Sequence, residues 1–284
     1  MKRKIVAVLM CATMVTMLGV GCGSKESEDS SSSSSETKEE LSEDDIKGSL
    51  DGVTLKVGTS GLFGPFSYYD EDGKTLIGYD LDLIQNLQDI LGFEIDGGVQ
   101  AMDYSALTTS LAEGKLDMGA AALCATDERK EVMNFSEIYC DSGQVVMVNK
   151  DNDEGIKSVD DLKGKKVAVE KGTASHTYAS KNLSDAELEV HDTITTAYES
   201  LEQGKVDAVI QDGPGASFYI KTTPDSKLEV VGDEFNQGQA PYCVAISKDC
   251  KYYDEINAAV KLLIENGTPM SCMQNGVNKH TAQI

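Results

Sequence analysis

Two stretches of the chain decide the fold, because they repeat one pattern at a spacing of 90 residues: "SLAEGKLDMGAAA" covers residues 110–122 and "SLEQGKVDAVIQD" covers residues 200–212. In each stretch a helical pattern of apolar residues ends at a glycine, and a Lys and then an Asp lead into a short apolar strand. The chain is therefore expected to build one helix–turn–strand unit twice.

Strand and helix patterns alternate around these two echo segments. "TLKVGTS" from Thr54 and "KKVAVEKGT" from Lys165 predict strands, whereas "DLDLIQNLQDIL" from Asp80 and "EINAAVKLLIENG" from Glu255 predict helices. Such alternation indicates an α/β protein with mainly parallel sheets. Two copies of the unit predict two lobes, each with its own sheet flanked by helices, and a cleft between them.

The N-terminus has the features of a signal peptide over residues 1–21. Lys2, Arg3 and Lys4 precede an apolar run over residues 5–20, and small residues follow it. A membrane-spanning helix needs about 20 apolar residues, and this run is shorter. We therefore expect the mature chain to be exported rather than to span the membrane.

Cys22 follows "LGVG" (residues 18–21), which resembles the bacterial lipoprotein box, where a leucine, two small residues and a cysteine mark cleavage and lipidation. Leu18 is one place too far upstream, so a secretory peptide with an incidental cysteine stays the alternative. The Ser-rich and acidic stretch that follows has "DSSSSSSE" at its centre. Such a composition buries too little apolar surface to fold. It predicts that residues 22–51 are a lipidated cysteine and a disordered tether, which hold the protein at the outer face of the bacterial cell membrane.

The charge balance limits the choice of partners. Without Lys2, Arg3 and Lys4, 22 of the 25 Lys and Arg remain against 48 Asp and Glu, which gives a net charge of −26. Nucleic acid is therefore not an expected partner. The chain has only three His, far apart in sequence, and no Cys-x-x-Cys, so neither a metal nor a cofactor is expected.

Opposite charges follow the two echo strands. "CATDERK" (residues 124–130) comes directly after the strand "GAAAL" and contains Arg129, and the second echo strand ends in Asp212. Ligands of α/β sheets gather beyond the carboxyl ends of the strands. The planar fork of Arg suits a carboxylate and Asp suits an ammonium group, so the pair could hold a free amino acid. The alternative is a surface arginine paired with Asp127 and Glu128, worth at most about 1 kcal/mol.

Beyond these charges, the chain from about Leu55 to Lys279 resembles the extracellular solute-binding proteins of ABC importers, specifically the polar amino acid family. The segments that carry the resemblance are, in order, "FGPFSYYDEDGKTLIGYDLDLIQNL", "MDYSALTTSLAEGKLDMG", "ATDERKEVMNFSEIYCDSGQVVMV", "SVDDLKGKKVAVEKGT", "LEQGKVDAVIQD" and "EINAAVKLLIENGT". The segments are specific in combination and cover nearly all of the globular part. No single one would suffice.

The resemblance implies how the head group of an amino acid would be bound. Arg129 stands at the family's carboxylate-clamping arginine, in its T-x-E-R pattern, and Asp212 at the aspartate that takes the ammonium group. Thr173 and the backbone N–H of Ala174 match the Gly-Thr turn that adds carboxylate donors from the second lobe.

The resemblance also implies what surrounds the rest of the ligand. Phe63 and Tyr104 match the aromatic residues that sandwich the ligand side chain. Ala122 and Cys124 would contribute backbone groups at the end of the first echo strand. Cys124 departs from the family, which usually has Ser or Thr there, so a hydroxyl contact with the carboxylate is lost.

Two further departures bear on which amino acid is bound. Ser60 occupies a position that holds an Asp in some relatives, where it reaches the ligand side chain. Glu170 stands where other relatives have Lys or an apolar residue, and if it faces the pocket it would favour a ligand with a donor or a positive side chain. We therefore expect a polar amino acid, first a basic one and then glutamine or cystine.

The resemblance places the second lobe (141–243) as an insertion in the first (52–140 plus 244–284). The chain would cross between the lobes at Tyr139–Gly143 and Ala240–Ala245. A ligand that touches one lobe through Arg129 and the other through Asp212 favours closure of the lobes. The closed form of the monomer is what a membrane permease would recognise.

The remaining cysteines allow disulfides, because export permits them. Cys140 and Cys243 both lie in the implied crossings and could pair, and Cys250 and Cys272 flank the last helix and could pair as well. Cys124 would then be a free thiol in the cleft. The alternative is that all five are reduced.

Two other function classes remain open in the sequence. Dehydratases that act on prephenate-like acids, of the cyclohexadienyl or arogenate type, share the two-lobed architecture, and Glu170 would be the only unusual candidate for acid–base chemistry. An amino-acid-sensing protein is the other. The combination of segments favours a transport protein that is not an enzyme.

Overall fold

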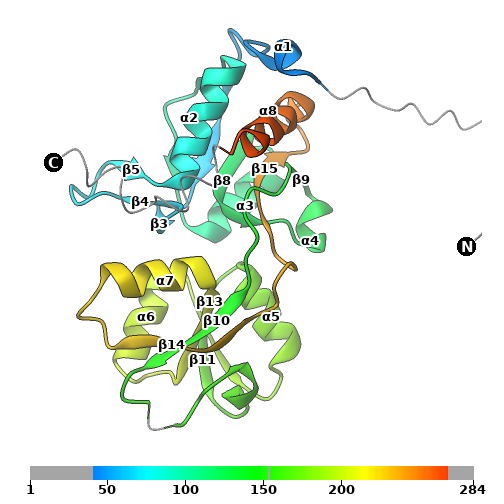
Figure 1. The fold of residues 1–284 in the computed structure, drawn as a ribbon. Helices are drawn as coiled ribbons and strands as arrows, with labels where there is room; N and C mark the ends of the chain where they lie inside the picture. Colours follow the sequence, from blue (N-terminus) through cyan, green and yellow to red (C-terminus); the bar gives the residue numbers. More distant parts are fainter. Residues whose placement is uncertain (1–40, 153, 268–284) are drawn as a thin grey trace, which may run out of the picture. The chain divides into compact units, whose positions relative to one another are not determined.

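Residues 41–152 and 154–267 are described by the computed structural model, and two mixed sheets organise them (Figure 1). The part of the chain built around the first sheet is called lobe 1 below. The strands of this sheet lie in the order β7-β2-β8-β15-β9. Their bounds are β2 (Val57–Thr59), β7 (Gln100–Ala101), β8 (Met118–Cys124), β9 (Met133–Phe135) and β15 (Tyr242–Ser247).

The second sheet, which defines lobe 2, has the order β12-β11-β13-β10-β14. Its strands are β10 (Gln144–Asn149), β11 (Lys166–Glu170), β12 (Glu187–His191), β13 (Ala208–Asp212) and β14 (Leu228–Phe235). The two orders match place by place, with the echo strands β8 and β13 in the centre. In both sheets the echo strand belongs to a parallel group on one side and pairs with an antiparallel strand on the other.

Helices cover both faces of each sheet, because alternate strand residues point to opposite faces. In lobe 2, Val145 and Met147 pack with the cluster that contains α6 and α7, whereas Val146 and Val148 pack on the opposite face. The helices are α1 (Glu43–Ile46), α2 (Tyr79–Leu91), α3 (Tyr104–Ala112), α4 (Asp127–Lys130), α5 (Ala174–Asn182), α6 (Ile194–Glu202), α7 (Gly213–Thr222) and α8 (Tyr253–Glu265), with a 3-10 turn, η1, at Val159–Leu162.

Short strands complete lobe 1. A pair made of β1 (Thr54–Leu55) and β6 (Glu94–Ile95) is parallel, and a small antiparallel sheet contains β3 (Leu62–Phe63), β4 (Ser67–Tyr69) and β5 (Leu76–Ile77). This small sheet places Phe63 at the edge of the lobe, next to the functional site described below.

Both echo segments form the same structure, down to individual hydrogen bonds. The backbone N–H of Lys115 donates to the Ser110 carbonyl at 2.8 Å, and the equivalent bond in lobe 2 measures 2.9 Å. The carboxylate of Asp117 accepts a backbone hydrogen bond from Lys56 at 2.7 Å, and that of Asp207 accepts one from Lys166 at 2.8 Å. Each echo aspartate thus fixes the start of the parallel strand beside its own strand.

The chain passes between the sheets twice, after β9 and after β14, and the two crossings lie side by side. Cys140 and Tyr242 form an antiparallel bridge, in which the N–H of Tyr242 donates to the Cys140 carbonyl at 2.8 Å and the N–H of Tyr139 donates to the Tyr242 carbonyl at 3.0 Å. The outer limits predicted for the lobes stay predictions, since residues 268–284 lie outside the described residues.

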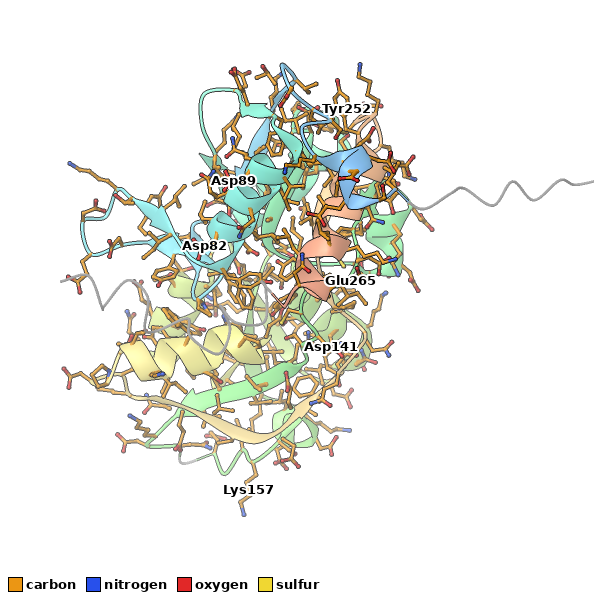
Figure 2. All side chains as sticks on the ribbon, turned by 45° about the horizontal axis from the view of Figure 1, so that its top comes forward. Asp82, Asp89, Asp141, Lys157, Tyr252 and Glu265 are labelled. Carbon is orange, nitrogen blue, oxygen red and sulfur yellow. The ribbon has the colours of Figure 1, made fainter. Side chains whose placement is uncertain are left out.

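The acidic excess of the chain lies largely at the surface. Figure 2 labels Asp82 and Asp89 on α2, Asp141 at a crossing and Glu265 at the end of α8, and all four are exposed. In the part of the chain that the structure describes, no helix is both long enough and apolar enough to cross a membrane. The predicted signal peptide and Cys22 lie outside the described residues.

The predicted disordered tether, residues 22–51, is wrong at its C-terminal end. Residues 43–46 form α1, and the side chains of Ile46 and Leu50 are each only 1 % exposed in the core of lobe 1. The backbone of Leu50 also donates to the Leu91 carbonyl at 2.8 Å, at the end of α2. The acidic composition concealed these two apolar anchors, which bury enough surface to order the segment. The rest of the predicted tether lies outside the described residues.

Leu50→Ala tests whether this segment belongs to the fold. Removal of a buried leucine side chain leaves a cavity and lowers the free energy of unfolding by about 2–5 kcal/mol. Leu41→Ala is the matched control, because Leu41 is 37 % exposed and its truncation is expected to change stability by less than about 0.5 kcal/mol. Urea unfolding followed by circular dichroism measures both. Equal stabilities of the two variants would contradict the packing described here.

Candidate functional site

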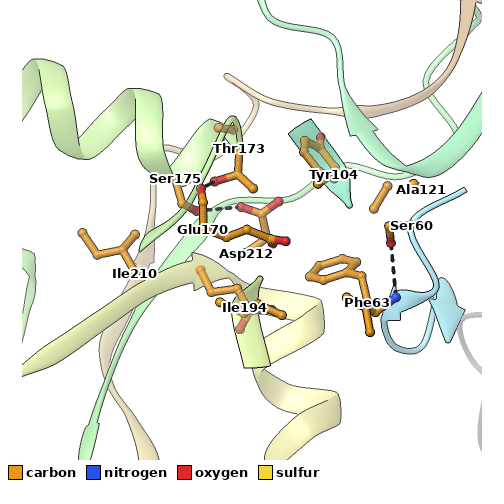
Figure 3. Close-up of a pocket in the computed structure, with 14 residues that line it drawn as sticks. Ser60, Phe63, Tyr104, Ala121, Glu170, Thr173, Ser175, Ile194, Ile210 and Asp212 are labelled. Atoms are coloured by element: carbon orange, nitrogen blue, oxygen red, sulfur yellow. Dashed lines mark hydrogen bonds between the residues drawn. The ribbon is translucent and has the colours of Figure 1, made fainter. Parts of the chain in front are cut away.

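A cavity lies between the carboxyl ends of the two echo strands and is lined by both lobes (Figure 3). The empty space between its walls, open solvent at its mouth included, is about 460 Å³. Figure 3 shows Ser60, Phe63 and Tyr104 on one side and Thr173, Ser175, Glu170 and Asp212 on the other. The lining residues are Ser60, Leu62, Phe63, Tyr104, Ala121, Ala122, Glu170, Thr173, Ala174, Ser175, Ile194, Ile210, Gln211 and Asp212.

Asp212 ends β13 and stands at the N-cap of α7, where the helix dipole favours negative charge. Gln144 and Ser175 donate hydrogen bonds to its Oδ1 at 2.9 and 3.2 Å, and the Tyr242 hydroxyl donates to its Oδ2 at 3.0 Å. Burial raises the pKa of Asp212 above its usual value, and these hydrogen bonds oppose that shift. The carboxyl is therefore held rigidly on the cavity wall, where it can bind a cation.

Arg129 is half-buried on the short helix α4, and its guanidinium already has protein acceptors. Nη1 donates to the Cys124 carbonyl at 2.7 Å and to the Tyr104 hydroxyl at 3.1 Å, and Nη2 donates to the Gly172 carbonyl of the other lobe at 2.6 Å. Arg129 does not line the cavity but lies behind Tyr104. Arg129, the predicted partner of the ligand carboxylate, thus already binds the backbone carbonyl of Gly172. This bond crosses the boundary between the two lobes, which is called the seam below.

The Gly-Thr turn has the geometry expected of a helix N-terminus. Gly172 has φ +79°, and Thr173 caps α5 by accepting a hydrogen bond from the backbone of His176 at 3.1 Å. Ala174 is the first residue of α5, and its N–H belongs to the first turn, which has no partner within the helix. The turn therefore presents backbone donors to the cavity that Thr173 and Ala174 line.

Ala122, predicted to contribute backbone groups to the ligand, lines the cavity, but its N–H is already bonded within lobe 1. It donates to Oδ2 of Asp80 at 2.8 Å, deep in lobe 1. Ala122 has φ +49°, a strained conformation for a residue with a Cβ, and the β8–β15 register shifts close by. The strand kinks here, and the N–H of Ala122 is directed to Asp80.

The cavity contains a second carboxyl besides Asp212. Glu170 is the last residue of β11 and is half-buried, and desolvation, together with the negative charge of Asp212, raises its pKa to about 8. Its side chain lines the cavity, which is one of the two orientations left open by the sequence. The hydroxyl of Ser60 also lines the cavity, at 3.1 Å from the Ser67 hydroxyl.

The aromatic residues named in the sequence lie where a ligand side chain could pass. The ring of Phe63 stacks on Phe66 with centroids 5.7 Å apart and meets the edge of Tyr242 at 6.5 Å. Burial raises the pKa of the Tyr104 hydroxyl, which stays protonated and accepts from Arg129.

Sequence reasoning missed several lining residues and two residues that support Asp212, Gln144 and Tyr242. Gln144 supports Asp212 only because β10 runs antiparallel to β13, with these two residues opposite each other, and no local sequence signal reveals that register. Ser175 was detectable, since it lies two residues after the Gly-Thr turn on the first turn of α5. The other lining residues missed are Leu62, Ala121, Ile194, Ile210 and Gln211.

The disulfide that the sequence allows between Cys140 and Cys243 is not formed. Cys243 is a free thiol, and the two crossings pair through Cys140 and Tyr242 instead, which leaves Cys243 one place out of register. Cys124 is a buried free thiol whose Sγ lies 3.7 Å from Oδ2 of Asp212, as expected of a thiol at the cleft. Cys272 lies outside the described residues, so its pairing with Cys250 stays a prediction. Among the described residues no cluster of three or more His, Cys, Asp or Glu could hold a metal.

Comparison with known proteins agrees with this architecture. The sequence profile of the bacterial extracellular solute-binding proteins, family 3, matches residues 55–274. The chain belongs to this family. Its members are solute-binding proteins rather than enzymes, and its extracytoplasmic location fits an exported chain.

Relatives of the binding protein are known in several bacteria. It is 32 % identical to the L-cystine-binding protein TcyJ of Escherichia coli over 76 % of this chain and 79 % of that protein. It is 29 % identical to the arginine-binding extracellular protein ArtP of Bacillus subtilis over 91 % of this chain and 92 % of that one. An ancestral arginine-binding protein solved with arginine superposes with a TM-score of 0.72 at 34 % identity, covering 82 % of this chain and all of that chain. The predicted two-lobed α/β fold is confirmed.

The buried carboxyl of Glu170 predicts a pH dependence of stability in the binding protein without ligand. Its pKa of about 8 in the folded state lies above the ordinary value of 4.5, so the folded state keeps a proton that the unfolded state releases. This contribution is complete below pH 4.5 and is lost as the pH rises through 8. Its full size is on the order of 4 kcal/mol.

Glu170→Gln should flatten this dependence, measured as melting temperature between pH 5 and pH 9. Glu187→Gln, which changes an exposed glutamate of the neighbouring strand β12, should retain the wild-type profile. If Glu170→Gln and wild type melt with the same pH profile, the carboxyl is not protonated in the fold.

Proposed function

We propose that this protein is the extracytoplasmic substrate-binding component of an ABC importer and captures a polar L-amino acid, with preference for a cationic side chain. The observation that carries the proposal is the pair of buried carboxyls, Asp212 and Glu170, that line one cavity between the two lobes. Asp212 takes the α-ammonium group of the ligand. Glu170 takes the positive end of its side chain.

The carboxylate of the ligand is bound from both lobes in this proposal. It replaces the Gly172 carbonyl as the acceptor for Nη2 of Arg129, and the first turn of α5 adds backbone donors. A carboxylate is a stronger acceptor for a guanidinium than a neutral carbonyl is, because the hydrogen bond is then charged on both sides. The exchange therefore favours the bound state.

Contacts across the seam support lobe closure as the mechanism of capture. Tyr242 of lobe 1 donates to Asp212 of lobe 2, and Lys181 of lobe 2 pairs with Glu128 of lobe 1. A ligand that adds its own bonds to both lobes shifts the equilibrium toward the closed form by its differential affinity. The permease then receives the amino acid from the closed protein, which Cys22 anchors to the outer face of the membrane through a lipid.

The named ligands of relatives support the ligand class. Arginine-binding and L-cystine-binding proteins are among the curated relatives, and a glutamine-binding protein of Bacillus subtilis is 28 % identical over 93 % of this chain. The pair of carboxyls favours the cationic member of this group, because a neutral or zwitterionic side-chain end leaves Glu170 without a partner.

Arg129→Ala is expected to abolish the thermal shift that the wild-type protein shows in a screen of the twenty amino acids, cystine and ornithine. A ligand at 100 times its dissociation constant stabilises the fold by about 2.7 kcal/mol, which raises the melting temperature measurably. Lys130→Ala, the change of an exposed neighbour, should leave the shift intact. Full affinity of Arg129→Ala in calorimetry would remove the carboxylate clamp from the proposal.

Glu170→Gln separates cationic from neutral ligands. Loss of one charged hydrogen bond of about 1.5–3 kcal/mol should weaken L-arginine and L-lysine by roughly tenfold or more and leave L-glutamine nearly unchanged. In the wild type the affinity for L-arginine should rise as the pH increases from 6 to 9, since the carboxyl must ionise to pair. Calorimetry at both pH values measures this. An equal loss of affinity for all three amino acids would show that Glu170 only supports the cavity wall and does not pair with the ligand side chain.

A further inference from the structure

A second cavity adjoins the ligand cleft and is not among the sites derived so far. It encloses about 730 Å³ including its mouth and lies between the β3–β4 hairpin of lobe 1 and helices α6 and α7 of lobe 2. We call it the aromatic groove. Four residues line both this groove and the cleft, namely Leu62, Phe63, Ile194 and Gln211. The two spaces are therefore neighbours across a single layer of side chains.

The groove is lined by rings and lacks charge. No Lys, Arg, Asp or Glu is among the described residues that line it. Two glycines make room for aromatic rings of the opposite lobe. A Cβ at Gly64 would meet the ring of Phe218 at 2.2 Å, and one at Gly215 would meet the ring of Phe63 at 2.3 Å. The aromatic lining consists of Phe63, Tyr68, Tyr69, Tyr198, Phe218 and Tyr219.

Two polar atoms in this lining are buried without a hydrogen-bond partner among the described residues. They are the side-chain carbonyl Oε1 of Gln211 and the hydroxyl of Tyr198, in side chains that are 6 % and 4 % exposed as residues. A buried carbonyl without a donor is unfavourable, because it has lost its hydrogen bonds to water. The layer of side chains that separates the groove from the cleft therefore contains an acceptor without a donor, which a ligand N–H could satisfy if the side chain of Gln211 turns toward the groove.

The electrostatic surroundings select the sign of the ligand. Burial raises the pKa of the Tyr198 hydroxyl well above its usual value, and the neighbouring Tyr219 and the carboxyls of Glu170 and Asp212 add to the shift. An anionic group in the groove would be repelled by these carboxyls where they are ionised and would find no cation among the described lining residues. A cation would be attracted, and the faces of aromatic rings bind alkylated ammonium and guanidinium groups in particular.

We propose that the aromatic groove is a distal subsite of the ligand cleft and takes the N-alkylated end of a cationic amino acid, of which Nω-methyl-L-arginine is a simple example. The inference rests on the proposed function and extends it. The α-amino acid head binds between Arg129 and Asp212, and the side chain passes Phe63. Its remaining distal N–H donates to Oε1 of Gln211, and its alkyl group lies among the rings.

The proposal distinguishes this ligand from one with two amino acid head groups. A second head group, as in L-cystine, would bring a second carboxylate to the groove. Among the described lining residues nothing positive could pair with it, and the carboxyls of Glu170 and Asp212 would repel it. The groove should therefore accept added apolar bulk on a cation and reject an added carboxylate.

Calorimetry of the full-length mature protein with three probes tests this: L-arginine, Nω-methyl-L-arginine and L-cystine. The expected result is that methylation leaves the affinity within about threefold of that for L-arginine or improves it, and that L-cystine binds at least tenfold more weakly. A loss of tenfold or more on methylation, with L-arginine still bound, overturns the distal subsite alone. Binding of L-cystine more tightly than both arginines also overturns it. Failure of every amino acid to bind overturns the proposed function as well.

Gln211→Met tests the role of the unpartnered carbonyl. Methionine has nearly the same length without the polar atom, so the melting temperature of the ligand-free protein should stay the same or rise. The affinity for Nω-methyl-L-arginine should fall about tenfold, because a hydrogen bond to a charged group is lost. Gln203→Met, at the end of α6 and away from both cavities, is the matched control.

Tyr198→Phe provides a second test if Gln211→Met does not fold. It keeps the ring and removes only the hydroxyl, and Tyr178→Phe, whose ring packs on Phe235 in lobe 2, is its control. Weaker binding of Nω-methyl-L-arginine by Tyr198→Phe with unchanged melting supports the subsite. Unchanged affinity in every folded variant of Gln211 and Tyr198 overturns it.

Discussion

The buried carboxyl of Asp212 is the constraint on which the rest of the site depends. A carboxyl removed from water needs donors on both oxygens, and the chain supplies them from three places: β10, the first turn of α5 and the crossing that contains Tyr242. The first two belong to lobe 2 and the last to lobe 1. The same group that would hold a ligand's ammonium therefore also links the lobes.

The net charge that a ligand meets in the cleft depends on which charged side chains already have hydrogen-bond partners in the protein. Arg129 donates to two backbone carbonyls and to Tyr104, so its positive charge is screened by dipoles on the lobe 1 side and at the seam. Asp212 and Glu170 lie on the cavity wall itself, and burial raises the pKa of each, with the charge of Asp212 adding to the shift of Glu170. When both carboxyls are ionised, the cavity is more negative than the pairing of one arginine with one aspartate suggests. In a chain with a strongly negative net charge, this field also draws cationic solutes toward the mouth.

The sequence predicted the elements whose signals are local, and missed those that depend on register. The two echo segments, the Gly-Thr turn and the carboxyl ends of β8 and β13 follow from short patterns, and they place Asp212 and Thr173 around one cavity. Phe63, which lines the same cavity, was named only through the family resemblance. The bonding of the Ala122 N–H within lobe 1 was not foreseen, because its direction depends on a left-handed residue and on a carboxyl 42 positions earlier in the chain. Gln144 was missed because only the antiparallel pairing of β10 with β13 brings it to Asp212.

Equivalent buried carboxyls at the ends of the two echo segments explain why these long-range hydrogen bonds matter. Ala122 and Asp212 are the last residues of the two echo segments, and a buried carboxyl lies at both places. In lobe 2 this carboxyl is the side chain of Asp212, at the end of β13 itself. In lobe 1 it is the side chain of Asp80 on α2, which accepts a hydrogen bond from the N–H of Ala122. Burial raises the pKa of Asp80 to about 7.

Each of these carboxyls also accepts a hydrogen bond from a tyrosine of a crossing, Tyr139 at 2.7 Å on Asp80 and Tyr242 at 3.0 Å on Asp212. The two tyrosines lie in the paired crossings, with ring centroids 6.4 Å apart. The Asp212 carboxyl is therefore linked through Tyr242 to the paired crossings that join the lobes. Two hydrogen bonds and one ring contact connect the carboxyls of Asp212 and Asp80 by way of these crossings.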